Sequence, residues 1–230
     1  MAVPDAVPFA RPAPHIAALF PDGVAAYEMK GHCTADGLFD SERACLSTAS
    51  PRRIKEFASG RLCARAALSE LGLATAPVLA GPDRAPIWPT GFAGSITHTE
   101  DYCVAVAAKL KRCEPAFRAL GVDAEQVGAV TPDLWPQLML NEEVRFLRHV
   151  SEAERNVKAS LIFSAKEAFY KAQYPLTNGW INFDEVAVEL GNNSFVVTIR
   201  NTELPIATHA LTFGGRFWVG SHEVVTALAI

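Results

Sequence analysis

Residues 160–173 read SLIFSAKEAFYKAQ and carry the clearest helix signal in the chain. Because successive residues of an α-helix are rotated by about 100°, the large apolar side chains share one arc of the helical wheel: Ile162, Phe163, Phe169, Tyr170 and Tyr174. This arc is expected to face a hydrophobic core. Lys166 lies in the middle of the arc and Glu167 at its border. On its own, the spacing of Glu167 and Lys171 favours an exposed ion pair worth about 0.3–0.5 kcal/mol.

The rest of the downstream half predicts strands and one more helix around this segment. Alternating apolar residues, and turn residues such as GNN at 191–193, indicate strands. The predicted strands cover residues 120–125, 183–190, 195–201 and 216–230, and a helical region covers 141–148.

The upstream half predicts the same kind of unit. Ser50 and Pro51 are the N-cap and first residue of a helix that extends to about residue 71 and is stopped by Gly72. Residues 1–21 contain five of the fifteen prolines and are expected to form an extended arm. The basic segment 109–118 is the predicted linker to the second half. Further strands are expected at 24–30, 95–99 and 102–108.

Each half therefore combines one long helix with several strands, which is typical of α+β proteins. We expect two similar subdomains related by a pseudo-twofold axis, each a long helix packed on a small and mostly antiparallel sheet. The predicted subdomains are residues 1–118 and 119–230, joined in a single compact unit.

Composition narrows the classes of function. The 230 residues are 50% hydrophobic with a formal net charge of −4, and no apolar stretch approaches the ~18 residues of a membrane helix. Prolines interrupt the N-terminal segment where a signal peptide needs a continuous apolar helix. The slight acidity argues against a protein that coats nucleic acid, and five cysteines without a CxxC pair argue against a zinc site. We therefore expect a cytoplasmic protein with neither a membrane nor a nucleic-acid partner.

Two arginines break the pattern of the upstream helix. On its wheel Arg53 and Arg61 fall inside the core-facing stripe, whereas Arg52, Lys55 and Arg65 fall outside it or at its edge. A charge outside the stripe is ordinarily solvated. A charge inside it is costly without a partner, so Arg53 and Arg61 are expected to meet an anion, either an internal carboxylate or a bound phosphate.

The sequence GVDAE at 121–125 supplies carboxylates for a charged site. Alternate residues of a strand face the same side, so Asp123 and Glu125 project together and repel each other unless a cation joins them. Hard oxygen ligands in low number suit Mg²⁺ or Mn²⁺, which complete their shells with water and substrate phosphate oxygens. Joined to Glu167 and to the cations of two helices, the pair predicts a polyphosphate site.

These motifs resemble those of a known family. The run FSAKEAFYKA at 163–172, with GVDAE about forty residues earlier, resembles the two signatures of phosphopantetheinyl transferases. The resemblance covers residues 50–182. Further pieces are similar to the branch typified by the enterobactin synthetase D component: RIKEF at 53–57, GR at 60–61, AR at 64–65, WP at 88–89 and GSITH at 94–98.

The resemblance implies a reaction in which Mg²⁺, or Mn²⁺, bridges the pyrophosphate of the co-substrate coenzyme A. A serine hydroxyl of an apo acyl or peptidyl carrier protein attacks the β-phosphate, and the products are the holo carrier protein and 3′,5′-ADP. Such carriers serve fatty acid, polyketide or nonribosomal peptide biosynthesis. The resemblance also implies a monomer, with coenzyme A in a cleft between a coenzyme A-binding N-terminal half and a C-terminal half that carries the metal and catalytic motifs.

The resemblance further implies roles for the residues of the two signatures. Asp123, Glu125 and Glu167 hold the metal, so Asp123 also belongs to the coenzyme A site. Lys166 and Lys171 lie against the phosphates. Glu167 is the nearest candidate base for the serine proton, but a metal-bound carboxylate has a lowered pKa, so a water relay is equally open. Lys171 is the candidate to stabilise charge on the departing phosphate.

Residues of the upstream half are implied in binding the nucleotide. Arg53, Arg61 and His98 bind the nucleotide and its 3′-phosphate, with Thr97 beside His98 in the same motif. Many relatives carry a Gly-Lys-Pro element where this sequence reads RAP at 84–86, so Arg84 is the candidate to replace that lysine.

Two basic clusters are candidates for docking an acidic carrier, and the second is preferred because it leads into the catalytic helix. They are Lys109, Lys111, Arg112 and Arg118 in the linker, and Arg145, Arg148, His149, Arg155 and Lys158. A solvated charged face is the alternative for both.

Two other functions stay open at this level. One is a catalytically silent module that binds coenzyme A or a nucleotide. The other is a metal-dependent phosphohydrolase that acts on a small phosphate ester. Neither needs a carrier protein, so the mass of a carrier after incubation separates them from a transferase.

Overall fold

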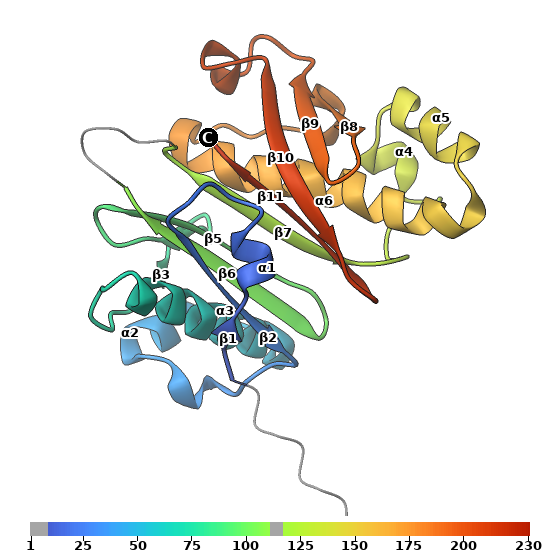
Figure 1. The fold of residues 1–230 in the computed structure, drawn as a ribbon. Coiled ribbons are helices and arrows are strands. Elements are labelled where there is room, and N and C mark those ends of the chain that lie inside the picture. The colour runs from blue at the N-terminus through green and yellow to red at the C-terminus, as the bar shows by residue number, and fades with distance from the viewer. Residues whose placement is uncertain (1–8, 111–116) are drawn as a thin grey trace, which may run out of the picture.

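The computed structural model describes residues 9–110 and 117–230, which form two antiparallel sheets that meet at their edges (Figure 1). The strand orders are β1-β2-β6-β5 in the first sheet and β7-β11-β10-β9-β8 in the second. The first sheet contains β1 (Arg11–Pro12), β2 (Val24–Lys30), β5 (Phe92–His98) and β6 (Tyr102–Lys109). The second contains β7 (Leu120–Gln126), β8 (Val186–Leu190), β9 (Ser194–Ile199), β10 (Thr212–Val219) and β11 (Glu223–Ala229). A separate hairpin is formed by β3 (Leu79–Ala80) and β4 (Pro86–Ile87).

One long helix covers each sheet (Figure 1). Helix α3 (Pro51–Glu70) packs on β2 and β6, and α6 (Glu152–Thr177) packs on β7 and β11. Short helices connect these elements: α1 (Pro14–Ala17), α2 (Asp40–Arg43), α4 (Trp135–Leu138) and α5 (Asn141–His149), with 3₁₀ turns η1 (Ala35–Gly37), η2 (Ala44–Leu46), η3 (Phe183–Glu185) and η4 (Pro205–Thr208). The chain therefore has the α+β fold that the sequence predicts.

Local sequence explains the ends of the first long helix. The Ser50 side chain accepts a hydrogen bond from the backbone N–H of Arg53 at 3.3 Å, and Pro51 occupies the first turn, as predicted. Past its C-terminal end, Gly72 has a φ of +81°, which an L side chain rarely adopts. The second long helix is longer than predicted, because it begins at Glu152 rather than near residue 160.

Two predicted segments differ from the structure. The extended arm predicted for residues 1–21 is wrong at Pro14–Ala17, which form α1. A proline is tolerated in the first turn of a helix, and the buried Ile16 anchors this turn to the core. The strand expected at 183–190 begins at Val186, since Phe183–Glu185 form η3. The strand content expected at 216–230 is confirmed in β10 and β11, which pair with each other. Residues 1–8 of the arm and residues 111–116 of the predicted linker lie outside the described residues.

The sheets join through side chains of two edge strands, β5 and β7. The Ser95 hydroxyl accepts a hydrogen bond from the N–H of Val122 at 3.1 Å, and the Thr97 hydroxyl accepts one from the N–H of Ala124 at 3.2 Å. Thr97 also donates to the Asp123 carboxylate at 3.0 Å. We call this contact the β5–β7 joint. It places the GSITH motif directly against the GVDAE motif.

The second long helix lies unusually close to the sheet at Gly121. A methyl group added to that glycine would lie 1.9 Å from the backbone oxygen of Ala168. The residues of GVDAE are therefore held directly under the KEA turn of α6. Among the described residues, no helix is both long and apolar enough to span a membrane.

Candidate active site

Asp123 lies at the centre of the site and is 3% exposed. One carboxylate oxygen, Oδ1, accepts the Thr97 hydroxyl at 3.0 Å and the Lys171 ammonium at 2.5 Å. The other oxygen, Oδ2, is buried and has no hydrogen-bond partner within the described part of the chain. A buried carboxylate oxygen without a partner is costly. This oxygen can therefore accept a hydrogen bond from a ligand or bind a cation.

Two further carboxylates crowd this centre. Glu125, two residues along β7, has its pKa raised to about 8 by burial and by the negative charge of Asp123, although Lys171 opposes the shift. Burial also raises the pKa of Glu167 on α6, against the effect of Lys171. Burial by itself would lower the pKa of Lys171, but Asp123 and Glu167 raise it. The lysine is therefore the cation that balances three neighbouring acids.

The chemistry of this donor set fits a divalent cation. The described residues contain no group of three or more His, Cys, Asp or Glu side chains arranged to hold a metal ion. Because burial raises the pKa of Glu125 and Glu167, a bound cation would be needed to keep these two carboxylates ionised beside Asp123, one oxygen of which has no partner in the described part of the chain. Hard oxygen donors of this number are the usual protein ligands of Mg²⁺, which takes its remaining ligands from water and phosphate.

A cavity of about 540 Å³ opens beside Lys171 between the two halves. Its walls include Asp83, Arg84, Trp88, Tyr170, Lys171, Tyr174 and Trp180. The Tyr170 ring lies 5.2 Å from the Trp180 ring and 5.5 Å from the Tyr174 ring, so the α6 side is largely aromatic. On the opposite side Arg84 occupies the turn of the β3–β4 hairpin with a φ of +68°. Positive φ at a non-glycine residue is strained and concentrates at functional sites.

A second polar group lies on β5 and α3. Arg53 donates from Nη1 to Nε2 of His98 at 3.0 Å, and the Glu56 carboxylate lies 3.5 Å from Arg53 and 3.7 Å from His98. Burial lowers the pKa of His98 to about 4, and Arg53 and Lys171 add to this effect against Glu56. His98 is therefore neutral near pH 7, and its Nε2 accepts a hydrogen bond from Arg53. Arg53 meets an internal carboxylate, one of the two partners expected for it.

The low pKa of His98 makes stability depend on pH. In the unfolded chain His98 takes up a proton below its ordinary pKa of 6.5, whereas the folded chain resists protonation down to about pH 4. The free energy of unfolding is therefore expected to fall as the pH drops from 6.5 to 4, by about 1.4 kcal/mol for each unit of pKa difference. Replacing His98 by Asn should flatten this dependence in urea titrations at pH 7 and pH 5. The same change at the exposed His209 is the control, and equal curves for both variants would contradict the assignment.

Two of the expected phosphate ligands do not join this site. Lys166 is 2% exposed, and its ammonium donates to the Glu143 carboxylate and to the Phe183 carbonyl, both at 2.7 Å. Arg61 is also buried, and its guanidinium donates to the backbone carbonyls of Val78 and Leu79. Both cations are therefore satisfied inside the protein, Arg61 by backbone carbonyls rather than by the carboxylate or phosphate that the wheel predicts.

The solvated position predicted for Arg65 is wrong. Arg65 is 9% exposed and donates to Glu42 at 2.5 Å and to the carbonyl of Gly37 at 2.6 Å. The wheel could not identify this because the partner, Glu42, lies on another element, α2. The sequence analysis also missed Glu143. This carboxylate accepts a hydrogen bond from the N–H of Leu140 at the start of α5, and its position three residues after Leu140 is the only signal for it in the sequence.

The aromatic residues of the cavity wall were predicted to face the core instead. The helical wheel placed Tyr170 and Tyr174 on the core-facing arc, whereas in the structure both side chains line the cavity. The nearby Trp180 is 70% exposed and follows the helix in a loop, where no periodic pattern applies.

Three acidic side chains thus surround Lys171 at the rim of a cavity with an aromatic wall. A family model described as 4'-phosphopantetheinyl transferase N-terminal domain matches residues 41–108, and one described as 4'-phosphopantetheinyl transferase superfamily matches residues 119–228. The chain belongs to the 4'-phosphopantetheinyl transferase superfamily. It is therefore a transferase, and the reaction of its family moves the phosphopantetheine group of coenzyme A to a carrier protein.

Individual relatives agree with the family models over most of the chain. The 4'-phosphopantetheinyl transferase Svp of Streptomyces mobaraensis is 36% identical over 84% of this chain and 78% of its own length. The 4'-phosphopantetheinyl transferase Npt of Nocardia iowensis is 30% identical over 93% of this chain and 99% of its own length. Enterobactin synthase component D of Escherichia coli K12 is 27% identical over 77% of this chain and 82% of its own length.

Proposed function

We propose that this chain binds coenzyme A with Mg²⁺ between its two halves and transfers the phosphopantetheine group to a serine of an apo acyl or peptidyl carrier protein. The observation that carries the proposal is the unpartnered oxygen of Asp123, buried beside Lys171 at the edge of a cavity between the halves. The cavity has the size and the partly apolar lining that a pantetheine arm requires. Lys171, the partner of Asp123, lines it, so a pyrophosphate would be placed beside this lysine.

In this proposal Asp123, Glu125 and Glu167 would hold the cation, which when bound would neutralise charge on the pyrophosphate. Lys171 lies among these carboxylates and stabilises the charge that develops on the departing phosphate. Glu167 accepts the serine proton, directly or through a water molecule. The thiol end of the substrate lies along the aromatic wall of α6, which excludes water from that part of the cavity.

The nucleotide end of the substrate is assigned to the first half. Arg53 on α3 and His98 on β5 form a hydrogen bond with each other. When a phosphate binds, Arg53 would donate to it instead, and His98 would donate to it through a ring N–H or after taking up a proton. Arg84 points from the hairpin to the cavity and takes the place of a lysine found in relatives. Thr97 holds Asp123, and Arg61 and Lys166 support the site from beneath without touching phosphate.

The test is a transfer assay. Incubation with coenzyme A, Mg²⁺ and an apo acyl carrier protein is expected to add one phosphopantetheine group to the carrier, read by mass spectrometry, and to release 3′,5′-ADP. A silent binding module leaves the carrier mass unchanged, and a phosphohydrolase consumes coenzyme A without changing the carrier. We also propose that the protein is a cytoplasmic monomer, and size-exclusion chromatography with light scattering tests the monomeric state.

Ligand binding is expected to stabilise the fold. Coenzyme A with Mg²⁺ should raise the free energy of unfolding by roughly 2.7 kcal/mol at a hundredfold excess over Kd. Thermal shift measures the effect, and adenosine, which lacks phosphates, is the matched ligand control. Equal shifts from coenzyme A and adenosine would contradict a site built around phosphate.

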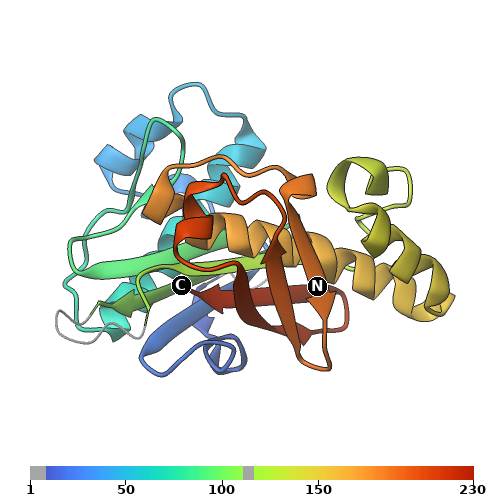
Figure 2. The same cartoon turned by 90° about the horizontal axis from the view of Figure 1, so that it is seen from above.

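The preferred carrier surface lies on α5, which stands beyond the end of the second sheet (Figure 2). Arg145 and Arg148 are exposed there, next to the exposed Phe146, whose ring lies 5.4 Å from the Lys158 ammonium. Arg155, by contrast, caps the end of α5 by donating to the Leu147 carbonyl. In the alternative cluster, Lys111 and Arg112 lie outside the described residues.

Reversing Arg145 and Arg148 to Glu is expected to raise the KM for an acidic carrier severalfold while sparing the KM for coenzyme A. Charged patches of this kind act mainly on the association rate, so the effect should fade as salt is added. Initial rates at low and high ionic strength measure it. Should both KM values stay unchanged at low salt, α5 is not the docking surface.

A further inference from the structure

The β3–β4 hairpin forms one wall of the cavity but is too short to hold its own position. It has two paired positions, Leu79 with Ile87 and Ala80 with Pro86. An isolated two-stranded hairpin is marginal in water even when it is longer. Its turn nevertheless presents Asp83 and Arg84 to the cavity. Something outside the hairpin must therefore fix its base.

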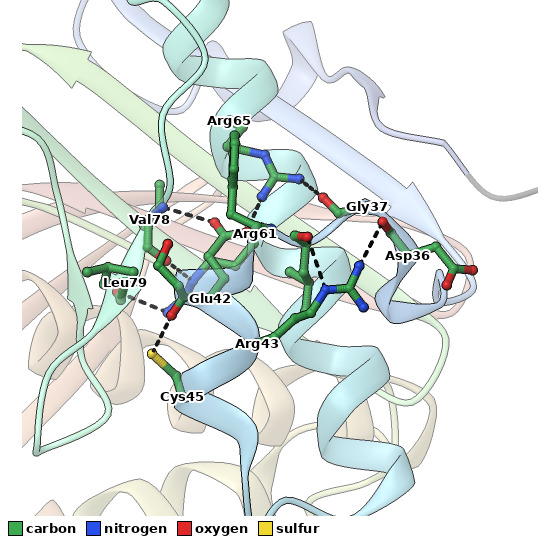
Figure 3. A network of polar contacts seen from close by, with 12 residues as sticks. Asp36, Gly37, Glu42, Arg43, Cys45, Arg61, Arg65, Val78 and Leu79 are labelled. Atoms are coloured by element: carbon green, nitrogen blue, oxygen red, sulfur yellow. Dashed lines mark hydrogen bonds and ion pairs between the residues drawn. The ribbon is translucent and has the colours of Figure 1, made fainter.

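A buried carboxylate holds the residue that precedes the hairpin (Figure 3). Glu42 on α2 is fully buried, and its Oε1 accepts the backbone N–H of Val78 at 2.9 Å. Its Oε2 accepts the N–H of Phe39 at 3.0 Å and the Arg65 guanidinium at 2.5 Å. Three donors thus satisfy this carboxylate, and Arg65 balances its charge.

Arg61 holds the same residue through its backbone carbonyl. Its Nε donates to the carbonyl of Val78 at 2.6 Å, and its Nη2 donates to the carbonyl of Leu79 at 3.3 Å (Figure 3). The guanidinium is fixed in turn by the Phe57 ring, whose centre lies 4.0 Å away. Hydrogen bonds to charged groups are stronger than neutral ones. Val78, itself fully buried, is therefore held by a carboxylate at its N–H and by a guanidinium at its C=O.

We propose that Glu42 is a positioning residue for coenzyme A: by holding Val78 it sets the hairpin that closes one wall of the cavity. This inference rests on the proposed function of the cavity. Glu42 touches no substrate and acts through the backbone of residues 78–87. Loss of its carboxylate leaves the catalytic carboxylates on β7 and α6 in place, so the effect falls on substrate binding and not on the chemical step.

Glu42→Gln tests the proposal, because its single amide oxygen can keep the donors Phe39 and Arg65 only by turning the amide nitrogen toward the N–H of Val78, which removes the anchor. The matched control is Glu28→Gln. Glu28 is a buried carboxylate of the same half, 5% exposed, that accepts hydrogen bonds from Tyr102 and Arg11 and contacts none of the hairpin residues. Both variants lose buried charge-assisted bonds, so both are expected to melt at a lower temperature.

Only Glu42→Gln is expected to raise the KM for coenzyme A, by about five- to tenfold, with kcat changed less than twofold at saturating coenzyme A. Hydrogen–deuterium exchange should quicken in peptides that cover 78–87 of this variant and slow again when coenzyme A is added. Glu42→Asp, which keeps the charge but shortens the side chain, is the second variant if Glu42→Gln does not fold.

An unchanged KM with uniform exchange across the chain would overturn the proposal and leave Glu42 a residue of stability alone. A fall in kcat without a change in KM would also overturn it. Failure of the proposed function looks different: the wild-type protein would then show neither carrier modification nor a thermal shift with coenzyme A, whatever Glu42 does.

Discussion

Asp123→Asn is expected to lower kcat/KM by at least about a hundredfold, which corresponds to about 2.7 kcal/mol of transition-state stabilisation. The substitution removes the negative charge around which Glu125, Glu167 and Lys171 are arranged. Metal affinity falls with the charge of its ligands, and Lys171 loses the partner that fixes it 2.5 Å from Oδ1. Rates of carrier modification over a Mg²⁺ titration measure the loss.

The variant is also expected to lose stability, since Asp123 belongs to the β5–β7 joint as well as to the site. A melting curve must therefore accompany the rates, so that activity is compared among folded molecules. Glu189→Gln is the control: it makes the same kind of change at an exposed carboxylate on β8 of the same sheet. Wild-type rates for Asp123→Asn at limiting Mg²⁺ would show that the metal assignment is wrong.

Gly121→Ala is expected to destabilise the protein by about 3 kcal/mol or more, the upper end of what overpacking of a core costs. The added methyl group would meet the backbone oxygen of Ala168 at 1.9 Å. A side chain could rotate away from such a contact, but a helix backbone moves only with the whole of α6. The displacement would also carry Glu167 away from Asp123, so folded molecules should lose activity.

Gly214→Ala provides a matched control for this prediction. Gly214 lies on β10 of the same sheet, and a methyl group added there would meet nothing within 4 Å. Urea unfolding of the two variants should therefore differ strongly, with Gly214→Ala close to the wild type. Similar midpoints for the two variants would mean that α6 does not pack on β7 as closely as described.

The sequence was sufficient to predict local structure because local signals are strong here. Ser50, Pro51 and Gly72 define the ends of α3, and the period of the apolar residues identifies α6. The pairing of the two sheets was beyond the reach of such signals. It depends on Ser95 and Thr97 bonding to a strand more than twenty residues away, and hydroxyl residues within a strand carry no mark of their partner.

The roles of the cations were predictable only in part. The wheels identified Arg61 and Lys166 as charges on buried faces, and both are buried. Their partners could not be read from the wheel of a single helix, because they lie on other segments: the backbone of Val78 for Arg61 and Glu143 for Lys166. A family motif names the residue types at a site but does not separate those that touch the substrate from those that hold the scaffold.

The β5–β7 joint has a consequence for turnover. Strands paired by a backbone ladder can shift only in steps of the ladder, since every bond must find a new partner. A joint made by the hydroxyls of Ser95 and Thr97 has no such steps, because each side chain can follow its acceptor or donor through small rotations. The two halves also share one buried cluster of apolar side chains, among them Val104, Val106, Val122 and Val225. They are therefore expected to move only by such small rotations and to keep the cavity between them formed from one turnover to the next.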